Sequence, residues 1–588
     1  MTSTRVLNQA GGALGLTLFL LVGCNAIVGL DKLQVTNEPA DSAGGGSGGQ
    51  PTNAEGGKAG SISEAGSGTT PDGESGAGGE GGEAPQGDCT TNQECTDRLS
   101  EEAMGQAGAS GTAVVAAACI QTPTPHCVKL LSEDCDAITG DYTNNRAIFV
   151  GSLFSTKGAT AATNLQRQQA AALGIEQSNA TGGVPEGSTS ANPRPLVMVS
   201  CDESTNLVRA ATHLVSDLHV PAIVGPNTSQ DTLDVSTKVT VPGGTVVMSP
   251  TGVASSIAAL SDNDLTWLMV PSDVQRAPLM IDQIGGLEDA TRTAHPTKQY
   301  VNLGVVFRND ALGIGTRSAL NSLKINGQPL ANAINLNNHV QIDPYSGANA
   351  TQATADLQAI VTKYLTFRPD IIVLAGTAEA ITVMTKLEEQ WPTDVDRPQY
   401  ILIDSTKVPE LIAAVTNNDD LRHRVRGTGI TPGPEGVETD VTATYNEFKG
   451  DYGLRYKGAA LTASGVGPAH DAAYAIGLAL AGTPTADISG ASVAQGLRRL
   501  AGGATKLRAN GTNVLAAFQK LTAGEKITAV GTFGMLDWDK NGAVLGGTLE
   551  MWCIGLGGAM GKPDYASSGL YFDIKAGTYS GKYVQCTP

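Results

Sequence analysis

The sequence predicts an α/β protein with two doubly wound parallel-sheet lobes, preceded by a signal peptide, a flexible Gly/Ser tether and a small Cys-rich segment. From residue 146 onward, short β-branched runs alternate with amphipathic helical stretches, which is typical of a parallel sheet covered by helices. The alternation pauses after residue 270 and restarts near residue 301, so two α/β units follow one another. A chain of 588 residues is also too long for one ordinary core.

The composition indicates a globular protein that does not bind nucleic acid. Hydrophobic residues make up 41% of the chain, which is enough for a buried core. The chain has 57 acidic against 38 basic residues and a net charge of −19, whereas binding a phosphate backbone needs a basic surface. Aromatic residues make up only 4%, so few side chains are available to stack on sugars or nucleosides. We therefore expect no nucleic acid among the partners.

The N-terminus carries the pattern of an export signal. Arg5 precedes an apolar run over residues 11–22 that is too short to span a bilayer as a helix. Leu21–Cys24 (LVGC) then resembles the lipobox of bacterial lipoproteins, which implies a signal peptide over 1–23 and lipidation at Cys24. The alternative is an ordinary secretory signal with a chance cysteine. We expect a bacterial cell-envelope lipoprotein, on the outer membrane or the periplasmic face, held to the membrane through its N-terminal lipid only.

A tether is predicted over residues 24–88. From residue 38 to residue 88 the chain is dominated by Gly, Ser, Ala, Glu and Pro, with nine acids and Lys58 as the one base. Such a segment cannot bury enough apolar surface to offset its conformational entropy. A Gly-rich chain of this length spans roughly 45 Å root-mean-square, enough to hold a domain clear of a membrane surface.

The cysteines predict a disulfide framework, because an even number in an exported chain meets an oxidising compartment. Apart from Cys24 they are Cys89, Cys95, Cys119, Cys127, Cys135, Cys201, Cys553 and Cys586. Five of these fall within residues 89–135, so we expect a stapled segment over 89–145. Two pairings are predicted, Cys135 with Cys201 and Cys553 with Cys586. The alternative is a zinc site around His126 and Cys127, which export and the lack of C-x-x-C pairs disfavour, so no metal is expected.

The elements of the two units follow from the apolar runs and the helical stretches between them. In the first unit the expected strands are 147–153, 196–200, 222–225, 245–248 and 265–270, with helices over 160–177, 204–217 and 229–239. In the second unit the expected strands are 301–307, 371–374 and 400–403, with helices over 313–324 and 378–390.

The stretch LDWDKNGAV, residues 536–544, has the D-x-D-x-N-G spacing that opens a calcium-binding EF-hand loop. The twelfth position of such a loop needs a bidentate acid, and Thr548 stands there. The flanks 532–536 and 549–552 predict strands, whereas an EF-hand needs helices. We therefore expect a hairpin turn, in which Asn541 and Gly542 supply the positive φ angles, and no calcium.

Several motifs resemble one family. Residues 222–229 (AIVGPNTS) and 246–251 (VVMSPT) are similar to the two ligand loops of type I periplasmic binding proteins, in particular the substrate-binding lipoproteins of branched-chain amino acid and amide ABC transporters. Residues 304–310 (GVVFRND) resemble the first strand of that family's second lobe, His470-Asp471-Ala472 a helix start, and residues 531–542 its late hairpin. The resemblance covers about residues 146–560.

The resemblance implies that residues 146–270 and 440–530 form lobe 1, and that 271–439 and 531–588 form lobe 2 with C-terminal hairpins. A ligand is then expected in the cleft between the lobes, beyond the carboxyl ends of the strands. The predicted ligand contacts are Thr228, Ser229, Ser249, Thr251, Phe154, Thr377 and Asp404.

The residues at these positions also favour a ligand by their own chemistry. Thr228 and Ser229 lie between a strand end and a helix start, where backbone N–H groups and the helix dipole favour an anion such as a carboxylate. The alternative is that Ser229 only caps its helix. The chain departs from amino-acid binders at Val253 and Leu312, and it offers few acceptors for an ammonium group besides Asp404. The ligand is therefore expected to be small and polar, with no commitment to an amino acid.

The expected function is solute binding, with a small-molecule ligand and an ABC permease as partners. The expected ligand bears a carboxylate, and its capture serves ABC-type import. The alternative is a surface-anchored sensor, or a degenerate scaffold that contacts envelope proteins. No enzyme is expected, because the sequence has no P-loop, no H-E-x-x-H and, in the two α/β units, no G-x-S-x-G nucleophile elbow, and no cofactor is expected.

Overall fold

The computed structural model describes residues 88–107, 114–158, 160–187, 192–434, 439–458, 461, 463–558 and 561–586. All of them belong to the compact unit from Gly82 to Pro588. The predicted signal peptide, the lipidation site at Cys24 and almost all of the tether lie outside the described residues. Within the described part of the chain, no helix combines the length and the apolar character that a membrane crossing requires.

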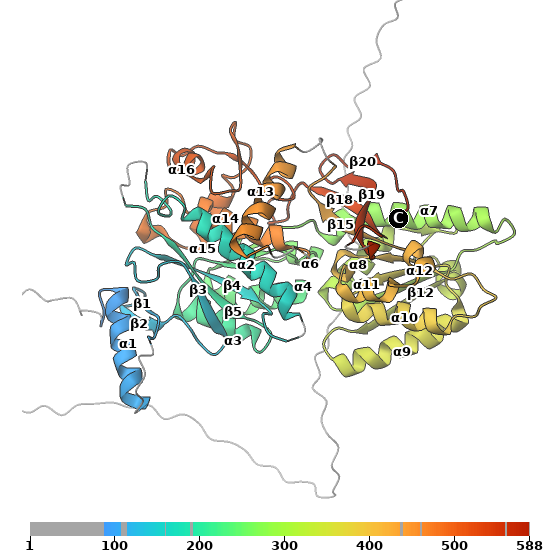
Figure 1. Cartoon of the computed structure of the whole chain (residues 1–588), viewed down its shortest axis with the longest axis horizontal. Coiled ribbons are helices and arrows are strands. Elements are labelled where there is room, and N and C mark those ends of the chain that lie inside the picture. The colour runs from blue at the N-terminus through green and yellow to red at the C-terminus, as the bar shows by residue number, and fades with distance from the viewer. Residues whose placement is uncertain are drawn as a thin grey trace, which may run out of the picture. The chain divides into compact units, whose positions relative to one another are not determined.

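The first sheet has six strands in the order β3-β5-β4-β6-β7-β8. Figure 1 labels three of them, β3, β4 and β5. Only the edge strand β3 is antiparallel to its neighbour. The strands are β3 (Cys135–Thr139), β4 (Ile148–Phe154), β5 (Leu196–Asp202), β6 (Ala222–Val224), β7 (Val246–Ser249) and β8 (Thr266–Leu268). This parallel order with crossover helices is the doubly wound arrangement that the sequence predicts.

Helices from two distant parts of the chain cover the first sheet. From the first part come α2 (Ala161–Ser178), α3 (Leu207–Thr212), α4 (Ser229–Val235), α5 (Val241–Gly243) and α6 (Ser255–Ala258). From the second part come α13 (Thr439–Arg455), α14 (Val466–Ala479), α15 (Gly490–Leu497) and α16 (Val514–Thr522), with the small strand pair β16 (Lys506–Arg508) and β17 (Thr528–Val530). Helix α14 is buried along its whole length. It packs closely on α2, where a Cβ at Gly174 would lie 2.6 Å from the carbonyl oxygen of His470.

The second sheet has eight strands in the order β12-β9-β13-β14-β15-β18-β19-β20. The first five strands are parallel and the last three are antiparallel. They are β9 (Leu303–Asn309), β12 (Val340–Ser346), β13 (Ile371–Ala375), β14 (Gln399–Leu402), β15 (Val425–Thr431), β18 (Thr548–Gly555), β19 (Asp564–Asp573) and β20 (Thr578–Gly581). The covering helices are α7 (Asp273–Ala294), α8 (Ala311–Ala319), α9 (Ala350–Phe367), α10 (Ile381–Gln390), α11 (Pro409–Val415) and α12 (Asp419–Arg424), and a short hairpin pairs β10 (Lys324–Ile325) with β11 (Gln328–Pro329).

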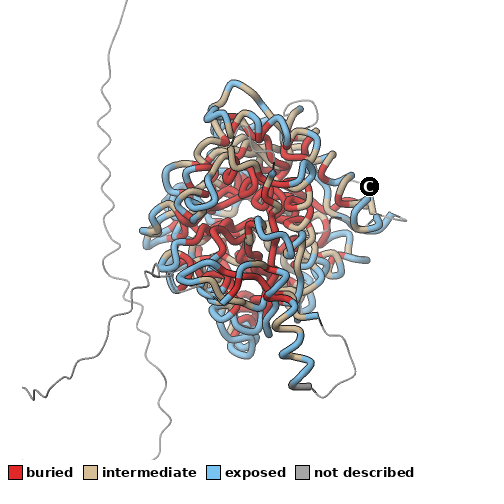
Figure 2. Tube along the Cα trace, turned by 90° about the vertical axis from the view of Figure 1, so that its left-hand side faces the viewer, coloured by how far each residue is buried: buried red, intermediate tan, exposed pale blue. Residues whose placement is uncertain are grey.

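Buried residues gather in the interior of the described chain, and exposed residues lie around its outside (Figure 2). Every residue of β7 and β13 is buried, because helices cover both faces of each sheet. We call the body around the first sheet lobe 1 and the body around the second sheet lobe 2. Each lobe has apolar clusters on its own strands, one of them containing Trp267 in lobe 1 and another Trp552 in lobe 2.

The predicted calcium-like stretch is a tight turn. One carboxylate oxygen of Asp539 accepts hydrogen bonds from the N–H groups of Asn541 and Ala543, both 2.9 Å, and Gly542 has a φ of 75°. The turn packs on lobe 1, where the N–H of Leu268 donates to the carbonyl of Gly542 over 2.8 Å. The stretch 532–536 does not form the expected strand and makes one isolated bridge. The hairpin therefore belongs to lobe 1, and the chain crosses to lobe 2 after it rather than at residue 531.

The Cys-rich segment contains helix α1 (Asn92–Ala107) and the hairpin of β1 (Ala117–Ile120) and β2 (His126–Lys129). Disulfides join Cys89 to Cys119 and Cys95 to Cys127. The two predicted pairings, Cys135 with Cys201 and Cys553 with Cys586, are both present. The Sγ atoms of Cys89, Cys95 and Cys119 lie within 4.8 Å of one another, but disulfide sulfurs are not the thiolates that zinc requires. The pairing thus removes the ligands of the alternative zinc site.

Candidate functional site

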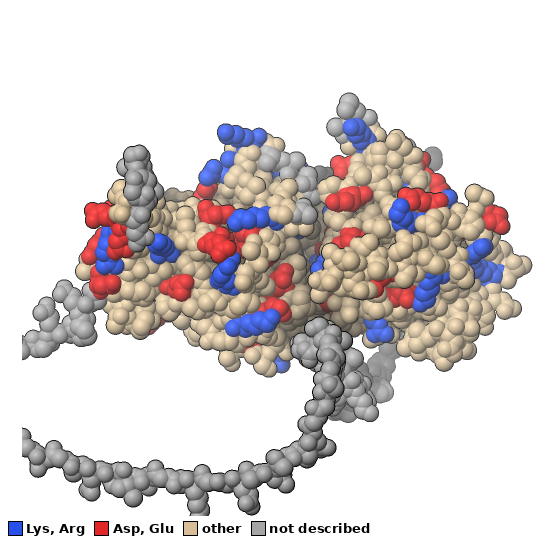
Figure 3. Space-filling view, turned by 90° about the horizontal axis from the view of Figure 1, so that it is seen from below, with Lys and Arg blue, Asp and Glu red and all other residues tan. Residues whose placement is uncertain are grey.

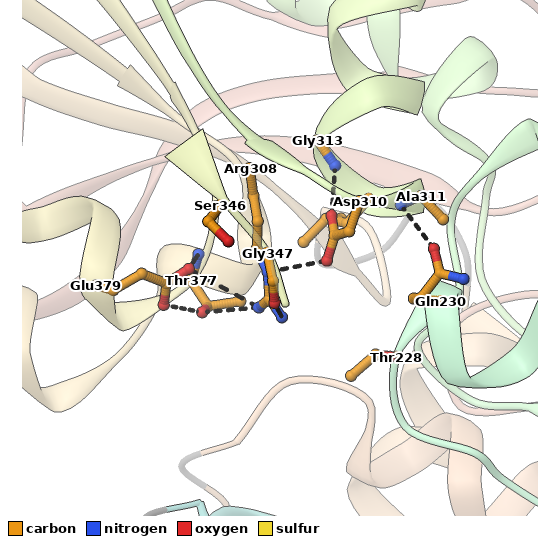
Figure 4. Close-up of polar contacts among 12 residues, drawn as sticks. Thr228, Gln230, Arg308, Asp310, Ala311, Gly313, Ser346, Gly347, Thr377 and Glu379 are labelled. Carbon is orange, nitrogen blue, oxygen red and sulfur yellow. Dashed lines mark hydrogen bonds and ion pairs between the residues drawn. The ribbon is translucent and has the colours of Figure 1, made fainter. Parts of the chain in front are cut away.

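The candidate site lies where the carboxyl ends of the two parallel sheets face each other. Strand order reverses between β4 and β6 in lobe 1 and between β9 and β13 in lobe 2, and doubly wound sheets bind ligands beyond such points. The lobes touch here, because Gln230 on α4 accepts a hydrogen bond from the N–H of Ala311 at the start of α8, 3.3 Å away (Figure 4). The loops after these strands therefore form the two walls of an interlobe junction.

Thr228 caps helix α4 on the lobe 1 wall. Its hydroxyl accepts the N–H of Asp231 over 3.0 Å and donates to the Asp231 carboxylate over 2.5 Å. The pKa of Asp231 is raised by burial, while the hydrogen bond from Thr228 and the charge of Arg308 in lobe 2 act in the opposite direction. The helix start that the sequence predicts as an anion site thus already holds an acid of its own. It also opens a helix of only 7 residues.

Ser229 and Ser249 are buried in lobe 1, with 3% and 0% of their surface exposed. The Ser229 hydroxyl accepts the N–H groups of Val253 and Ala254 over 3.0 and 3.2 Å. The Ser249 hydroxyl donates to the carbonyl of Pro226 over 2.9 Å. Both hydroxyls join the loop after β6 to the loop after β7, so their ligand-binding role stays a prediction while their loop-building role is observed.

Thr251 and Phe154 also have partners within lobe 1. The Thr251 hydroxyl donates to the backbone carbonyl of Asn227. Phe154 ends β4, and its fully buried side chain belongs to the apolar core of lobe 1. The ring packs within that core, and the ligand contact at Phe154 stays a prediction.

Arg167 on α2 is a buried cation beside these loops, with 6% of its surface exposed. Its guanidinium donates to the side-chain oxygens of Asn164 and Asn227 and, over 2.8 Å, to the carbonyl of Ser464. Burial lowers the pKa of Arg167 to about 10, and the charges of Glu203 and Asp404 act against that shift. Arg167 is thus held by neutral oxygens, within electrostatic reach of acids from both lobes.

Glu203 follows β5 and is 5% exposed. Its Oε1 accepts hydrogen bonds from the Ser155 hydroxyl over 3.2 Å and from the N–H of Asn227 over 3.4 Å. Its Oε2 has no partner in the described part of the chain. Burial, and next the charge of Asp231, raise the pKa of Glu203 well above its ordinary value. At this edge, lobe 1 therefore carries a buried carboxyl oxygen that has no hydrogen-bond partner among the described residues.

The lobe 2 wall is built around Arg308 at the end of β9 (Figure 4). Its Nε pairs with Asp310 over 2.9 Å, and its Nη2 donates to the carbonyl of Gly347 over 3.1 Å. Its Nη1 reaches the Thr377 hydroxyl over 3.5 Å and Glu379 over 3.8 Å. The Arg308 side chain is 24% exposed, so this charged cluster stays in contact with solvent.

The two acids of this cluster differ in their pKa shifts. Burial raises the pKa of Asp310, and the charge of Arg308 only partly offsets that. Burial also acts to raise the pKa of Glu379, but hydrogen bonds from Thr377, the backbone and Tyr345, together with Arg308, outweigh it and lower the pKa. Thr377 thus contacts Glu379 and Arg308 rather than standing free.

Asp404 follows β14 and was expected to be the acceptor for a ligand's ammonium group. Its Oδ2 is instead paired with Nη1 of Arg276 on α7, and the two side chains are 15% and 7% exposed. The Nε of Arg276 donates to the carbonyl of Pro271 over 2.8 Å. Asp404 therefore lies at the junction, as predicted, but with a cation of this chain already bound to it.

The sequence analysis did not include Arg167, Glu203 or Arg276 among the site residues. Of these three, only Glu203 had a recognisable sequence signal. Asp202 and Glu203 come shortly after the strand expected over 196–200, so two acids could have been placed at the carboxyl edge of the sheet. Arg167 and Arg276 lie inside helices, where sequence alone gives no sign of which face meets the junction. The face that Figure 3 shows has acidic and basic side chains interspersed, so its charge does not indicate where a ligand binds.

No protein-family model matches this chain, and no curated protein is similar to it in sequence. Among solved structures, the branched-chain amino acid transporter substrate-binding protein LivJ from Streptococcus pneumoniae, in complex with isoleucine, has a TM-score of 0.49 at 16% identity and covers 72% of this chain and 99% of its own. The leucine-binding protein LivK from Thermotoga maritima has a TM-score of 0.49 at 13% identity, covering 71% of this chain and 98% of its own.

An ABC transporter substrate-binding protein from Desulfitobacterium hafniense, in complex with Leu, has a TM-score of 0.47 at 17% identity and covers 71% of this chain and 100% of its own. These neighbours are of the kind that the sequence resembles.

Proposed function

We propose that this protein is a solute-binding protein of the cell envelope, which captures a small polar ligand bearing a carboxylate between its two lobes and delivers it to an ABC permease. It is anchored by a lipid on Cys24 and acts without catalysis. The alternative role is that of a surface sensor or a scaffold for envelope proteins.

One observation carries this proposal. The two strand-end edges face each other, and buried polar atoms on both walls have no partner among the residues that the structure describes, namely Oε2 of Glu203 in lobe 1 and Nη2 of Arg276 in lobe 2. Buried polar groups in folded proteins are nearly always hydrogen-bonded, because leaving one unpaired costs about 1–3 kcal/mol. Two such atoms at one interlobe junction support a ligand that completes the hydrogen bonding there.

The test is a metabolite screen on the full mature chain by thermal shift, followed by calorimetry and small-angle scattering for each hit. We expect small polar carboxylates to raise the melting temperature and reduce the radius of gyration, because ligand binding stabilises the closed form. If no metabolite stabilises the protein at millimolar concentration, the scaffold role becomes the better one. If a ligand binds but its uptake by cells is unchanged when the gene is deleted, the sensor role replaces import.

The anchor has its own test. Metabolic labelling with a fatty-acid analogue should mark the protein, and Cys24→Ala should lose both the label and the membrane fraction. A wild-type protein that is unlabelled and fully released from membranes contradicts the anchor without touching the solute-binding proposal.

A further inference from the structure

A groove lies at the amino-terminal edge of the lobe 1 sheet, at the opposite end of the strands from the candidate site. Ile148 at the start of β4 and Pro221 just before β6 line it, together with Thr485 and Ile488 between α14 and α15. Its volume is about 410 Å³, which falls within the range of roughly 300–1,000 Å³ that ligand pockets occupy. Strand β4 has 7 residues, so the groove is separated by roughly 20 Å from the carboxyl ends of the strands.

The Cys-rich segment forms one wall of this groove. Asn92 at the start of α1 and Cys119 on β1 line it. Asn92 is buried, and its side-chain amide donates to the carbonyls of Tyr142 and Asn144 over 2.9 and 3.0 Å. The disulfide from Cys119 to Cys89 ties β1 to the residues just before α1. The wall is therefore fixed to lobe 1 before any ligand arrives.

The charge at the groove is positive. Its lining includes Arg146 and Arg194, and none of the described residues in the lining is acidic. Glu186, just outside the lining, pairs with Nη2 of Arg146 over 3.0 Å. Two guanidinium groups against this one carboxylate leave a net charge of +1. The remaining titratable side chain in the lining is His219, which is exposed.

Arg194 is a buried cation at this groove, with 1% of its surface exposed. Its guanidinium contacts neutral oxygens, the carbonyl of Thr483 over 2.7 Å and the hydroxyl of Thr485 over 3.4 Å, and its Nε has no partner among the described residues. Burial lowers the pKa of Arg194, and the charge of Glu186 acts against that shift. A buried cation without a counter-ion in contact is costly. An anion in the groove reduces that cost.

Arg146 can contact such an anion directly. Its side chain is 44% exposed and uses Nη2 for Glu186, whereas its Nε and Nη1 have no hydrogen-bond partner in the described part of the chain. Free guanidinium N–H groups bind a carboxylate through charge-assisted hydrogen bonds. Phe149 and Ile488 line the same groove and are half-buried, so they offer apolar surface to the rest of a ligand.

We infer that this groove binds a small organic monoanion, a carboxylate on an apolar body, and that the Cys-rich segment serves as one wall of the site. A single negative charge matches the net charge of the groove. The inference does not rest on the proposed interlobe function, because the groove and the junction lie at opposite ends of the lobe 1 sheet.

Phenylacetate, phenylacetamide and phenethylamine are matched probes, because they share an apolar ring and differ in the end group. By calorimetry on the full mature chain, phenylacetate should bind most tightly, phenylacetamide more weakly and phenethylamine not detectably. Arg146→Gln should weaken phenylacetate binding about tenfold, because charged hydrogen bonds are lost. Arg455→Gln is the matched control, since Arg455 is another exposed arginine of lobe 1 that pairs with one glutamate, and it should leave the affinity unchanged.

Two substitutions beside Arg146 should change the affinity in opposite directions. Glu186→Gln removes the carboxylate that competes for Arg146 and keeps an oxygen acceptor for Thr485, so phenylacetate should bind about threefold more tightly. Asn145→Asp adds a carboxylate to the lining and keeps the acceptor for the N–H of Asn92, so phenylacetate should bind about threefold more weakly. Melting temperatures without ligand check that both variants fold. Changes in the same direction, or no change in either folded variant, overturn the site.

The remaining outcomes separate the groove from the interlobe junction. No binding of phenylacetate at millimolar concentration, or equal affinity for the acid and the amide, overturns the inference. Equal effects of Arg146→Gln and Arg455→Gln place the anion elsewhere and overturn it as well. Binding in the groove should leave the radius of gyration unchanged, and a decrease on addition of phenylacetate would assign the probe to the junction instead. If the metabolite screen finds no ligand but phenylacetate binds as described, the interlobe proposal falls and the groove stands.

Discussion

At the edge of lobe 1, hydroxyl and amide side chains join the loops and the buried ionisable groups Arg167 and Glu203 bond to neutral partners, whereas at the edge of lobe 2 charged side chains pair with one another. Ser249 is fully buried and joins two loops of lobe 1. Arg308 is 24% exposed and contacts Asp310, Glu379 and a backbone carbonyl. The two sheets have the same strand order at this edge, so topology sets where a site lies and the loop residues set its chemistry.

The two edges should also differ in how easily their loops move. In lobe 1 the hydrogen bonds of Ser229, Ser249 and Thr251 tie the loops after β6 and β7 together without a charge. In lobe 2 the partners of Arg308 come from three loops and remain accessible to solvent, where ion pairs exchange partners at low cost. We therefore expect lobe 1 to act as the fixed wall and lobe 2 as the wall that adjusts.

The largest effect should follow from Arg167→Leu in lobe 1. The substitution leaves the acceptors on Asn164, Asn227 and Ser464 without their buried donor, so urea denaturation should show a loss of about 3 kcal/mol in the free energy of unfolding. The matched substitution in lobe 2 is Arg308→Leu, which should cost about 1 kcal/mol because its partners can turn to water. Equal losses at the two positions would contradict the contrast between the walls.

A second comparison uses one hydroxyl from each wall. Ser249→Ala removes a fully buried hydroxyl that donates to Pro226 and accepts from Gly252, so it should lower the free energy of unfolding by about 2 kcal/mol. Thr377→Ala removes a partly exposed hydroxyl and should cost less than about 1 kcal/mol. Thermal or urea unfolding measures both, and a larger loss for Thr377→Ala would reverse the assignment of the fixed wall.

Much of the fold could be predicted from sequence because the central strands are continuous apolar runs. The strands expected over 245–248 and 371–374 are found as β7 and β13, within one residue at each end. Strand β12 was not predicted, because it is an edge strand with polar residues and an exposed Pro344, which has no N–H to donate. Edge strands lack the burial on both faces that produces a recognisable pattern.

The site was predictable in position but not in chemistry. Loops after parallel strands must meet at one edge, so the neighbourhood of Thr228, Thr377 and Asp404 followed from strand order. The partner of Asp404 is Arg276, 128 residues earlier in the chain, and no local pattern links the two. A hydroxyl at a strand end can hydrogen-bond either to a ligand or to a neighbouring loop, because it donates and accepts in the same way in both cases. The sequence therefore does not distinguish the two roles.

The third prediction compares one acid from each wall by its dependence on pH. Burial raises the pKa of Glu203 above its ordinary value of 4.5, so between that value and the raised pKa the folded state keeps a proton that the unfolded chain has lost. Stability should therefore fall as the pH rises through this window, by at most about 1.4 kcal/mol per pH unit, and Glu203→Gln should flatten the slope. The groups that face Glu203 are Ser155, Asp202, Asp231, Asn227 and Arg167.

Glu379 should show the opposite sign, because its pKa is lowered in the folded protein. Its contribution to stability is present above its ordinary value of 4.5 and is lost as the pH falls through its lowered pKa, and Glu379→Gln should remove that loss. Urea denaturation of both variants between pH 3 and pH 8 measures the two slopes. If the contributions of Glu203 and Glu379 to the pH dependence of the free energy of unfolding have the same sign, the two pKa shifts do not have the opposite directions expected here.

The smallest effect should come from the contact that joins the two walls. Gln230 accepts a long hydrogen bond of 3.3 Å from the N–H of Ala311, and Gln230 itself is exposed, so water replaces it at little cost. Gln230→Ala should leave the free energy of unfolding within about 0.5 kcal/mol of wild type, yet reduce the ratio of closed to open molecules about twofold, since that energy acts directly on the closure equilibrium. Single-molecule energy transfer between a dye on each lobe measures this ratio. Arg455→Ala is the control, because Arg455 pairs with Glu176 within lobe 1, and it should leave the ratio unchanged. If Gln230→Ala and Arg455→Ala shift closure equally, the contact at Ala311 is not what joins the two walls.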